Sequence, residues 1–75
     1  MVTYWVDYSF TYEYFDTDEN DWVEYEDFDA GRFHCLKKHI PGAVRSQVEK
    51  DLENEQYRNL KVTINDSYIT TDEEV

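Results

Sequence analysis

Apolar and polar residues alternate with a period of two along the start of the chain. This alternation, in β-branched and aromatic residues, is typical of a strand that buries one face. We therefore predict a long strand over residues 2–15, with its even-numbered positions on the buried face and its odd-numbered positions facing outward. The even positions are Val2, Tyr4, Val6, Tyr8, Phe10, Tyr12 and Tyr14.

A second strand is predicted after a polar turn. Residues 16–21 are all polar and cannot continue the pattern, whereas residues 22–28 alternate again. A hairpin centred between Asp18 and Glu19 keeps apolar side chains beside apolar ones. It also sets two glutamates opposite one another, which is unfavourable without a positive neighbour. The expected pairs are Tyr14 with Val23 and Tyr12 with Tyr25 on the core face, and Phe15 with Trp22, Glu13 with Glu24 and Thr11 with Glu26 on the outer face.

Two helices are predicted between this hairpin and the last strand. Asp29 can accept hydrogen bonds from the first turn of a helix over about residues 30–39. Pro41 and Gly42 end that helix, and the proline also opens the next one, over about residues 41–54. The apolar stripes are Phe33, Leu36 and Ile40 in the first helix, and Val44, Val48 and Leu52 in the second.

Strand periodicity returns near the end of the chain, at Leu60, Val62 and Ile64. One strand over about residues 59–70 is expected, and a terminal hairpin that turns at Asn65-Asp66 is the alternative. The predicted fold is a single α+β domain over residues 1–75, in the order strand, strand, helix, helix, strand. Its antiparallel sheet has the order 2-1-3, and both helices cover the even-numbered face of the central strand. Residues 71–75 are expected to fray.

The first 29 residues also carry a high density of negative charge. The chain has 18 Asp and Glu residues against seven Lys and Arg, for a net charge of -11. Same-face residues of a strand repeat about every 6.6 Å, and a DNA strand carries one phosphate about every 3.4 Å. A hairpin face and its turn can therefore approach the charge density of a nucleic-acid backbone. Ten carboxylates precede the first basic residue, Arg32: Asp7, Glu13, Asp16, Asp18, Glu19, Asp21, Glu24, Glu26, Asp27 and Asp29.

This charge favours a basic protein surface as the partner, because it repels nucleic acid and anionic lipid. Segregated signs cost stability, and the net charge exceeds what solubility requires. A purely solubilising role is the alternative. The predicted partner-binding residues are Trp5, Asp7, Glu13, Asp16, Asp18, Glu19, Asp21, Trp22, Glu24, Glu26 and Asp27, with the two tryptophans on the outer face of the hairpin.

No metal or cofactor site is predicted. One acidic segment follows the ligand spacing of an EF-hand loop, but Asp21 stands where the loop needs glycine and a strand precedes it. Weak calcium binding is therefore only a third option. A zinc site at His34, Cys35 and His39 lacks a fourth ligand. The EF-hand-like positions are Asp16, Asp18, Asn20, Trp22, Glu24 and Asp27.

No catalytic motif stands in the sequence, and we expect a binding protein rather than an enzyme. Glu13 and Glu24 are paired carboxylates, but a flat sheet offers them no cleft for acid–base chemistry. A single cysteine, Cys35, cannot form an intramolecular disulfide. The chain has neither a basic start followed by an apolar run nor an apolar stretch of about 20 residues. A soluble cytoplasmic protein is expected.

In size, charge and Tyr-rich strands, though in no motif, the chain resembles the small acidic proteins with which phages and mobile elements mimic DNA. The resemblance implies an inhibitor that occupies the nucleic-acid site of a restriction, repair or CRISPR enzyme, in the cytoplasm of an infected bacterial host. The alternative is a structural or assembly module whose free strand edge pairs with another chain, giving a homodimer or a hetero-complex.

Overall fold

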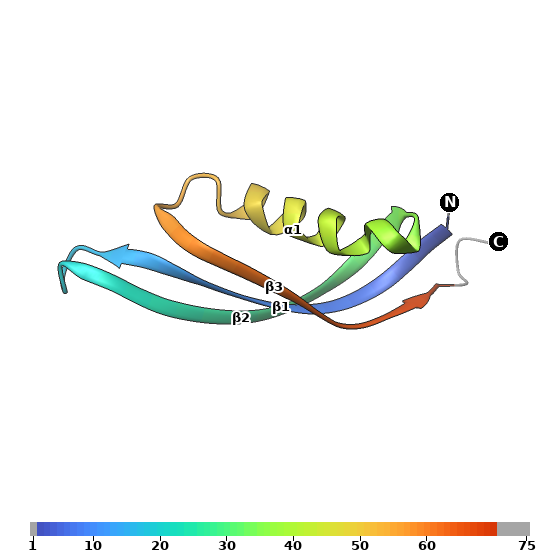
Figure 1. The fold of residues 1–75 in the computed structure, drawn as a ribbon, viewed down its shortest axis with the longest axis horizontal. Coiled ribbons are helices and arrows are strands. Elements are labelled where there is room, and N and C mark those ends of the chain that lie inside the picture. Colours follow the sequence, from blue (N-terminus) through green and yellow to red (C-terminus); the bar gives the residue numbers. More distant parts are fainter. Residues whose placement is uncertain (1, 71–75) are drawn as a thin grey trace.

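A computed structural model describes residues 2–70 of the chain. Three antiparallel strands form one sheet in the order β2-β1-β3, and one α-helix lies on one face of it (Figure 1). The predicted 2-1-3 order is therefore confirmed, whereas the two-helix order is wrong. The elements are β1 (Val2–Asp16), β2 (Asp21–Cys35), a 3-10 helix η1 (Lys37–His39), α1 (Ile40–Asp51) and β3 (Tyr57–Ile69).

The hairpin register agrees with the sequence prediction. All five expected pairs are found, including Tyr12 with Tyr25 on the core face and Phe15 with Trp22 on the outer face. The β1–β2 ladder continues without interruption to Val2 opposite Cys35. An uninterrupted ladder gives each face a consistent set of side chains, because strand side chains alternate strictly between the two faces.

The helix predicted over residues 30–39 does not exist. Residues 30–35 are instead the end of β2, where they pair with the first residues of β1. Without them, that part of β1 would lack backbone hydrogen bonds along one edge. Gly31 also weakens a helix by about 1 kcal/mol. Phe33 still faces the core, but from a strand, and its ring meets the Tyr8 ring edge-on at 6.2 Å between centroids.

The core lies between α1 and the even-numbered face of β1. Every fourth residue from Ile40 to Leu52 is buried, which confirms the predicted stripe at Val44, Val48 and Leu52. The helix itself runs from Ile40 to Asp51 instead of over about residues 41–54. From β1 this stripe meets Tyr4, Val6 and Tyr8. A helix rises about 1.5 Å per residue and a strand about 3.3 Å. The 12-residue helix is thus about 18 Å long and cannot cover the 15-residue β1, which is about 50 Å long.

β3 is one strand, and the terminal hairpin at Asn65-Asp66 is not formed. Asp7 faces Asp66 while Tyr8 faces Ile64, so Asn65 is an extra residue in a β-bulge. A second irregularity lies near Asn59, whose φ of 58° is left-handed. Each bulge shifts the register of β3 locally, and the apolar side chains of the strand still face α1.

The molecule is elongated, with principal extents of 52 × 20 × 19 Å. The turn end of the β1–β2 hairpin projects beyond the C-terminal end of α1 (Figure 1). Among residues 2–70, no helix is long and apolar enough to cross a membrane. The predicted fraying of residues 71–75 concerns a segment outside the described part of the chain.

Candidate functional site

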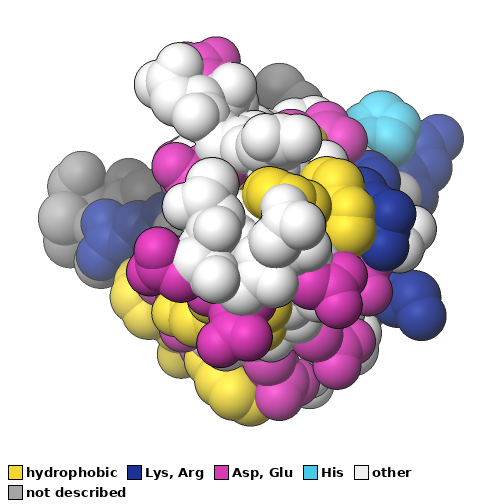
Figure 2. All heavy atoms as spheres, turned by 90° about the vertical axis from the view of Figure 1, so that its left-hand side faces the viewer, with side chains coloured by type: hydrophobic (Ala, Val, Ile, Leu, Met, Phe, Trp, Pro, Cys, Tyr) yellow, Lys and Arg dark blue, Asp and Glu magenta, His cyan; other side chains and the backbone are white. Residues whose placement is uncertain are grey.

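The structure divides the predicted acidic surface into three parts. Asp18 and Glu19 are exposed in the turn between β1 and β2. The other acidic residues alternate between the face that carries α1, the helix-side face, and the opposite face, the open face. Seen from the turn end, carboxylates are spread around apolar side chains, while Lys and Arg lie toward the margins (Figure 2). Asp7, Glu13, Glu24 and Glu26 lie on the open face, and Asp16, Asp21, Asp27 and Asp29 lie on the helix-side face.

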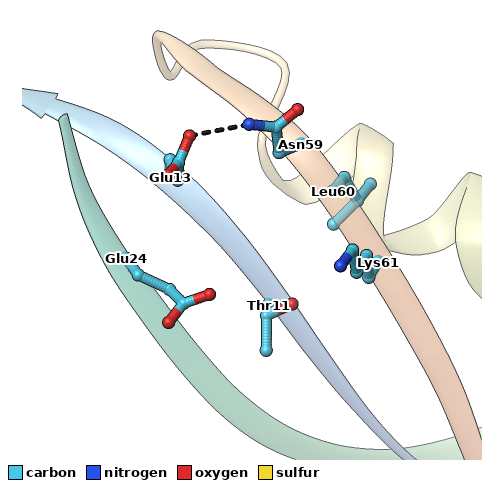
Figure 3. Close-up of a pocket in the computed structure, with 6 residues that line it drawn as sticks. All are labelled: Thr11, Glu13, Glu24, Asn59, Leu60 and Lys61. Atoms are coloured by element: carbon cyan, nitrogen blue, oxygen red, sulfur yellow. Dashed lines mark hydrogen bonds between the residues drawn. The ribbon is translucent and has the colours of Figure 1, made fainter.

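On the open face, the predicted pairing of Glu13 with Glu24 is present, but the chain itself supplies the positive neighbour. The Glu13 carboxylate accepts a hydrogen bond from Arg58 Nε at 2.7 Å. It also accepts one from Asn59 Nδ2 at 2.7 Å (Figure 3). These two hydrogen bonds, that of Arg58 first, lower the pKa of Glu13. The unfavourable pair is therefore relieved internally and does not by itself require a basic partner.

An open pocket of about 400 Å³ lies beside this pair (Figure 3). Thr11, Leu60 and Lys61 line it together with the two glutamates and Asn59. The carboxylate of Glu13 is held by its two donors, so the pair does not offer two unpartnered carboxylates for acid–base chemistry. The pocket is a shallow polar hollow in the open face.

The two candidate tryptophans also take part in intramolecular contacts. Trp5 Nε1 donates to the Asp7 carboxylate at 3.1 Å. The Trp22 ring packs edge-to-face on Phe15 at 5.5 Å, and the Arg58 guanidinium lies 4.2 Å from its centroid. Stacking an arginine on an aromatic ring is favourable. These contacts stabilise the open face, and both tryptophans stay partly exposed.

The EF-hand-like residues do not converge. Glu24 and Asp27 lie on opposite faces of β2, so they cannot ligate one ion together. Among residues 2–70, no group of three His, Cys, Asp or Glu side chains is placed to hold a metal ion. His34 and Cys35 belong to β2 rather than to a helix, and His34 Nδ1 lies 3.0 Å from the Thr3 hydroxyl.

The turn is held by one of its own acidic residues. Asp16 Oδ1 accepts the backbone N–H of Asp18 at 2.9 Å and of Glu19 at 3.4 Å. Asn20 completes the turn with a left-handed φ of 56°. Asp16 therefore stabilises the turn, while the Asp18 and Glu19 side chains are exposed at its tip.

β2 is an edge strand whose free edge is capped by its own aspartates. In each case the N–H of the next residue donates to the Oδ1 atom of an aspartate: Trp22 to Asp21 at 2.7 Å, Phe28 to Asp27 at 2.8 Å, and Ala30 to Asp29 at 2.8 Å. These N–H groups are an even number of residues apart, so they point to the same edge. Each aspartate keeps its charge and its remaining lone pairs, so it can still accept from a cationic donor.

Four tyrosines, three of which (Tyr12, Tyr14 and Tyr25) the sequence prediction had assigned to the core face, form a partly exposed aromatic surface. They lie on the helix-side face beyond the end of α1, and we call them the distal tyrosine surface: Tyr12, Tyr14, Tyr25 and Tyr57. Tyr12 is central, with its ring 5.5 to 6.5 Å from those of the other three. Tyr25 is 43% exposed. The difference between helix length and strand length is the signal that could have predicted this surface.

No family model, curated protein or solved structure matches this chain. The geometry and charge of the hairpin are therefore the basis for inferring a function.

Proposed function

We propose that this protein binds a basic protein surface through the turn end of its hairpin and thereby blocks a nucleic-acid-binding groove of its target. The observation that carries the proposal is the concentration of charge along one edge. β2 holds five carboxylates between Asp21 and Asp29, a strand length of about 27 Å. Asp18 and Glu19 extend this row around the tip. No Lys or Arg occurs in either segment.

The ordering of these carboxylates supports the proposal. The aspartates of β2 are fixed by hydrogen bonds to their own strand, so binding would cost less side-chain entropy than ordering free side chains. The hairpin end also projects beyond α1, which allows it to enter a groove (Figure 1). Opposite charges would steer the encounter and make association fast and sensitive to salt.

The alternative, association by strand-edge pairing, is disfavoured at β2. Its capped N–H groups cannot donate to an incoming strand unless the aspartates move away. At the other edge of the sheet, the Leu60 carbonyl accepts a hydrogen bond from Arg45 Nη1 at 3.3 Å. Like charge on two copies would oppose a homodimer through the hairpin end.

The test reverses charge at the hairpin end without disturbing the turn. Asp18→Lys with Glu26→Lys changes two exposed carboxylates and leaves Asp16, which holds the turn, in place. Glu49→Lys with Asp66→Lys is the matched control, because it changes net charge equally on α1 and at the other end of β3. Immobilised protein would be exposed to a nuclease-treated bacterial lysate at low salt.

We expect the original protein and the control to retain nucleic-acid-binding proteins that added duplex DNA displaces. The hairpin variant should retain none of them, and retention should fall steeply as salt rises. The proposal is wrong if the hairpin variant and the control retain the same proteins, or if DNA does not compete.

A further inference from the structure

We propose that the distal tyrosine surface is a docking face for arginine side chains of the basic partner. This inference deepens the proposed function and rests on it. Stacking on the tyrosine rings would be a contact additional to charge attraction, because mimicry of phosphate requires carboxylates and no aromatic rings. Tyr12 and Tyr57 pack partly against the core, but the buried stripe of α1 ends at Leu52, and all four rings stay at least partly exposed.

The ring geometry leaves aromatic surface accessible. Tyr14 and Tyr25 meet edge-to-face at 6.5 Å, and the Tyr12 and Tyr57 rings meet in the same way at 6.1 Å. Tyr12, Tyr14 and Tyr57 are each partly exposed, and Tyr25 is the most open of the four. In an edge-to-face pair, the ring that presents its edge keeps both of its own faces clear of that neighbour, so a planar group can stack there.

Carboxylates surround these rings. Asp27 is on the same face, opposite Phe10, whose ring stacks on Tyr12 at 6.1 Å. Glu55, in the loop after α1, also interacts electrostatically with Tyr12. Burial is the first cause that raises the pKa of Tyr12, and electrostatic interactions, among them those with the carboxylates of Glu55 and Asp27, raise it further. The rings therefore lie in a negative electrostatic environment.

Arg58 and Lys61, the cations of the neighbouring part of β3, face away from this surface. Arg58 lies over Trp22 and pairs with Glu13 on the open face, and Lys61 lines the open-face pocket. On the helix side, Arg45 pairs with Glu49 and donates to the Leu60 carbonyl, and Lys50 lies in the last turn of α1. The distal tyrosine surface has carboxylates near it and partly exposed tyrosine rings that an external cation can contact.

The chemistry of the surface selects arginine among its conceivable occupants. A guanidinium stacks on aromatic rings and binds carboxylates through two parallel hydrogen bonds, whereas an ammonium does so less well. A second copy of this chain would bring carboxylates against carboxylates. An apolar segment would bury the surrounding carboxylates without a partner, which is costly.

The test compares nona-arginine with nona-lysine peptides at equal ionic strength, using fluorescence anisotropy or calorimetry. The original protein should bind the arginine peptide about two- to fivefold more tightly, the gain expected from stacking on exposed rings. Tyr14→Leu with Tyr25→Leu keeps apolar volume and removes two rings. It should lower arginine-peptide affinity by more than lysine-peptide affinity, so that the preference for arginine decreases to the part that bidentate pairing with carboxylates provides.

Phe28→Leu is the matched control, because Phe28 is an exposed aromatic residue on the open face. It should retain the preference for arginine. Circular dichroism would verify folding, and Tyr25→Leu alone, at the most exposed position, repeats the test if the double variant does not fold. Equal binding of both peptides by the original protein, or a preference for arginine that loss of the rings does not reduce, overturns the inference alone. Absence of binding by either peptide at low salt overturns the proposed function as well.

Discussion

Replacing Tyr8 by alanine should remove a large part of the stability of this domain. Tyr8 is 3% exposed beneath α1, and its ring contacts those of Phe33 and Phe10 at 6.2 and 6.3 Å. Truncating a buried aromatic residue costs about 3 to 5 kcal/mol. A chain of 75 residues has a free energy of unfolding of about 4 to 11 kcal/mol, at about 0.05 to 0.15 kcal/mol per residue. The loss is therefore comparable to the whole stability at the lower end of this range.

Phe28→Ala provides the comparison, because Phe28 is an aromatic residue of the same sheet that is 66% exposed. It should cost about 1 kcal/mol or less. Urea denaturation followed by circular dichroism would give both free energies of unfolding, with the slope against urea verifying two-state behaviour. Equal losses in the two variants would refute a core confined to the α1 side of the sheet.

Three further outcomes are expected. Hydrogen bonds lower the pKa of Glu13 in the folded state, so its contribution to stability is present above about pH 4.5 and lost as pH falls through the lowered value. Glu13→Gln should make the free energy of unfolding, measured by urea denaturation, fall less steeply as the pH is lowered. An unchanged dependence on pH would contradict this expectation. Burial, then the charges of Asp29 and Asp51, raise the pKa of Tyr8, so its contribution is present below about pH 10 and lost at higher pH. Tyr8→Phe should make the free energy of unfolding fall less steeply as the pH rises, in the same assay. Asp27→Ala frees an edge N–H and should increase self-association in sedimentation velocity more than Glu26→Ala, which removes the same charge; equal behaviour would show that capping does not protect the edge.

The register of the hairpin was predictable because it depends on local alternation and a short turn. The same register, extended past residue 28, already places Val2 opposite Cys35, as the structure does. The predicted helix over residues 30–39 was wrong because residues 30–35 continue this ladder, although Phe33, Leu36 and Ile40 have helical spacing. A spacing of three or four within ten residues is weak evidence when a long strand still lacks a partner.

The candidate site was predictable in composition but not in geometry. Alternation alone indicates that the acidic residues of β2 divide between two faces. The pairing of Glu13 with Arg58 joins residues 45 positions apart, and it depends on the bulged register of β3. The distal tyrosine surface depends on how far α1 extends along β1. Neither arrangement has a local sequence signal.

The sequence by itself determined the long alternating strand, the hairpin pairing, the buried stripe at Val44, Val48 and Leu52, and the density of negative charge, because each depends on neighbouring residues. Only the tertiary structure decided that residues 30–35 complete the hairpin, that Arg58 neutralises Glu13, and that four tyrosines remain beyond the helix. These outcomes depend on long-range pairing and on the relative lengths of packed elements. The physical reason is that backbone groups of a long strand must be paired, and a helix of 12 residues spans less than half of that strand.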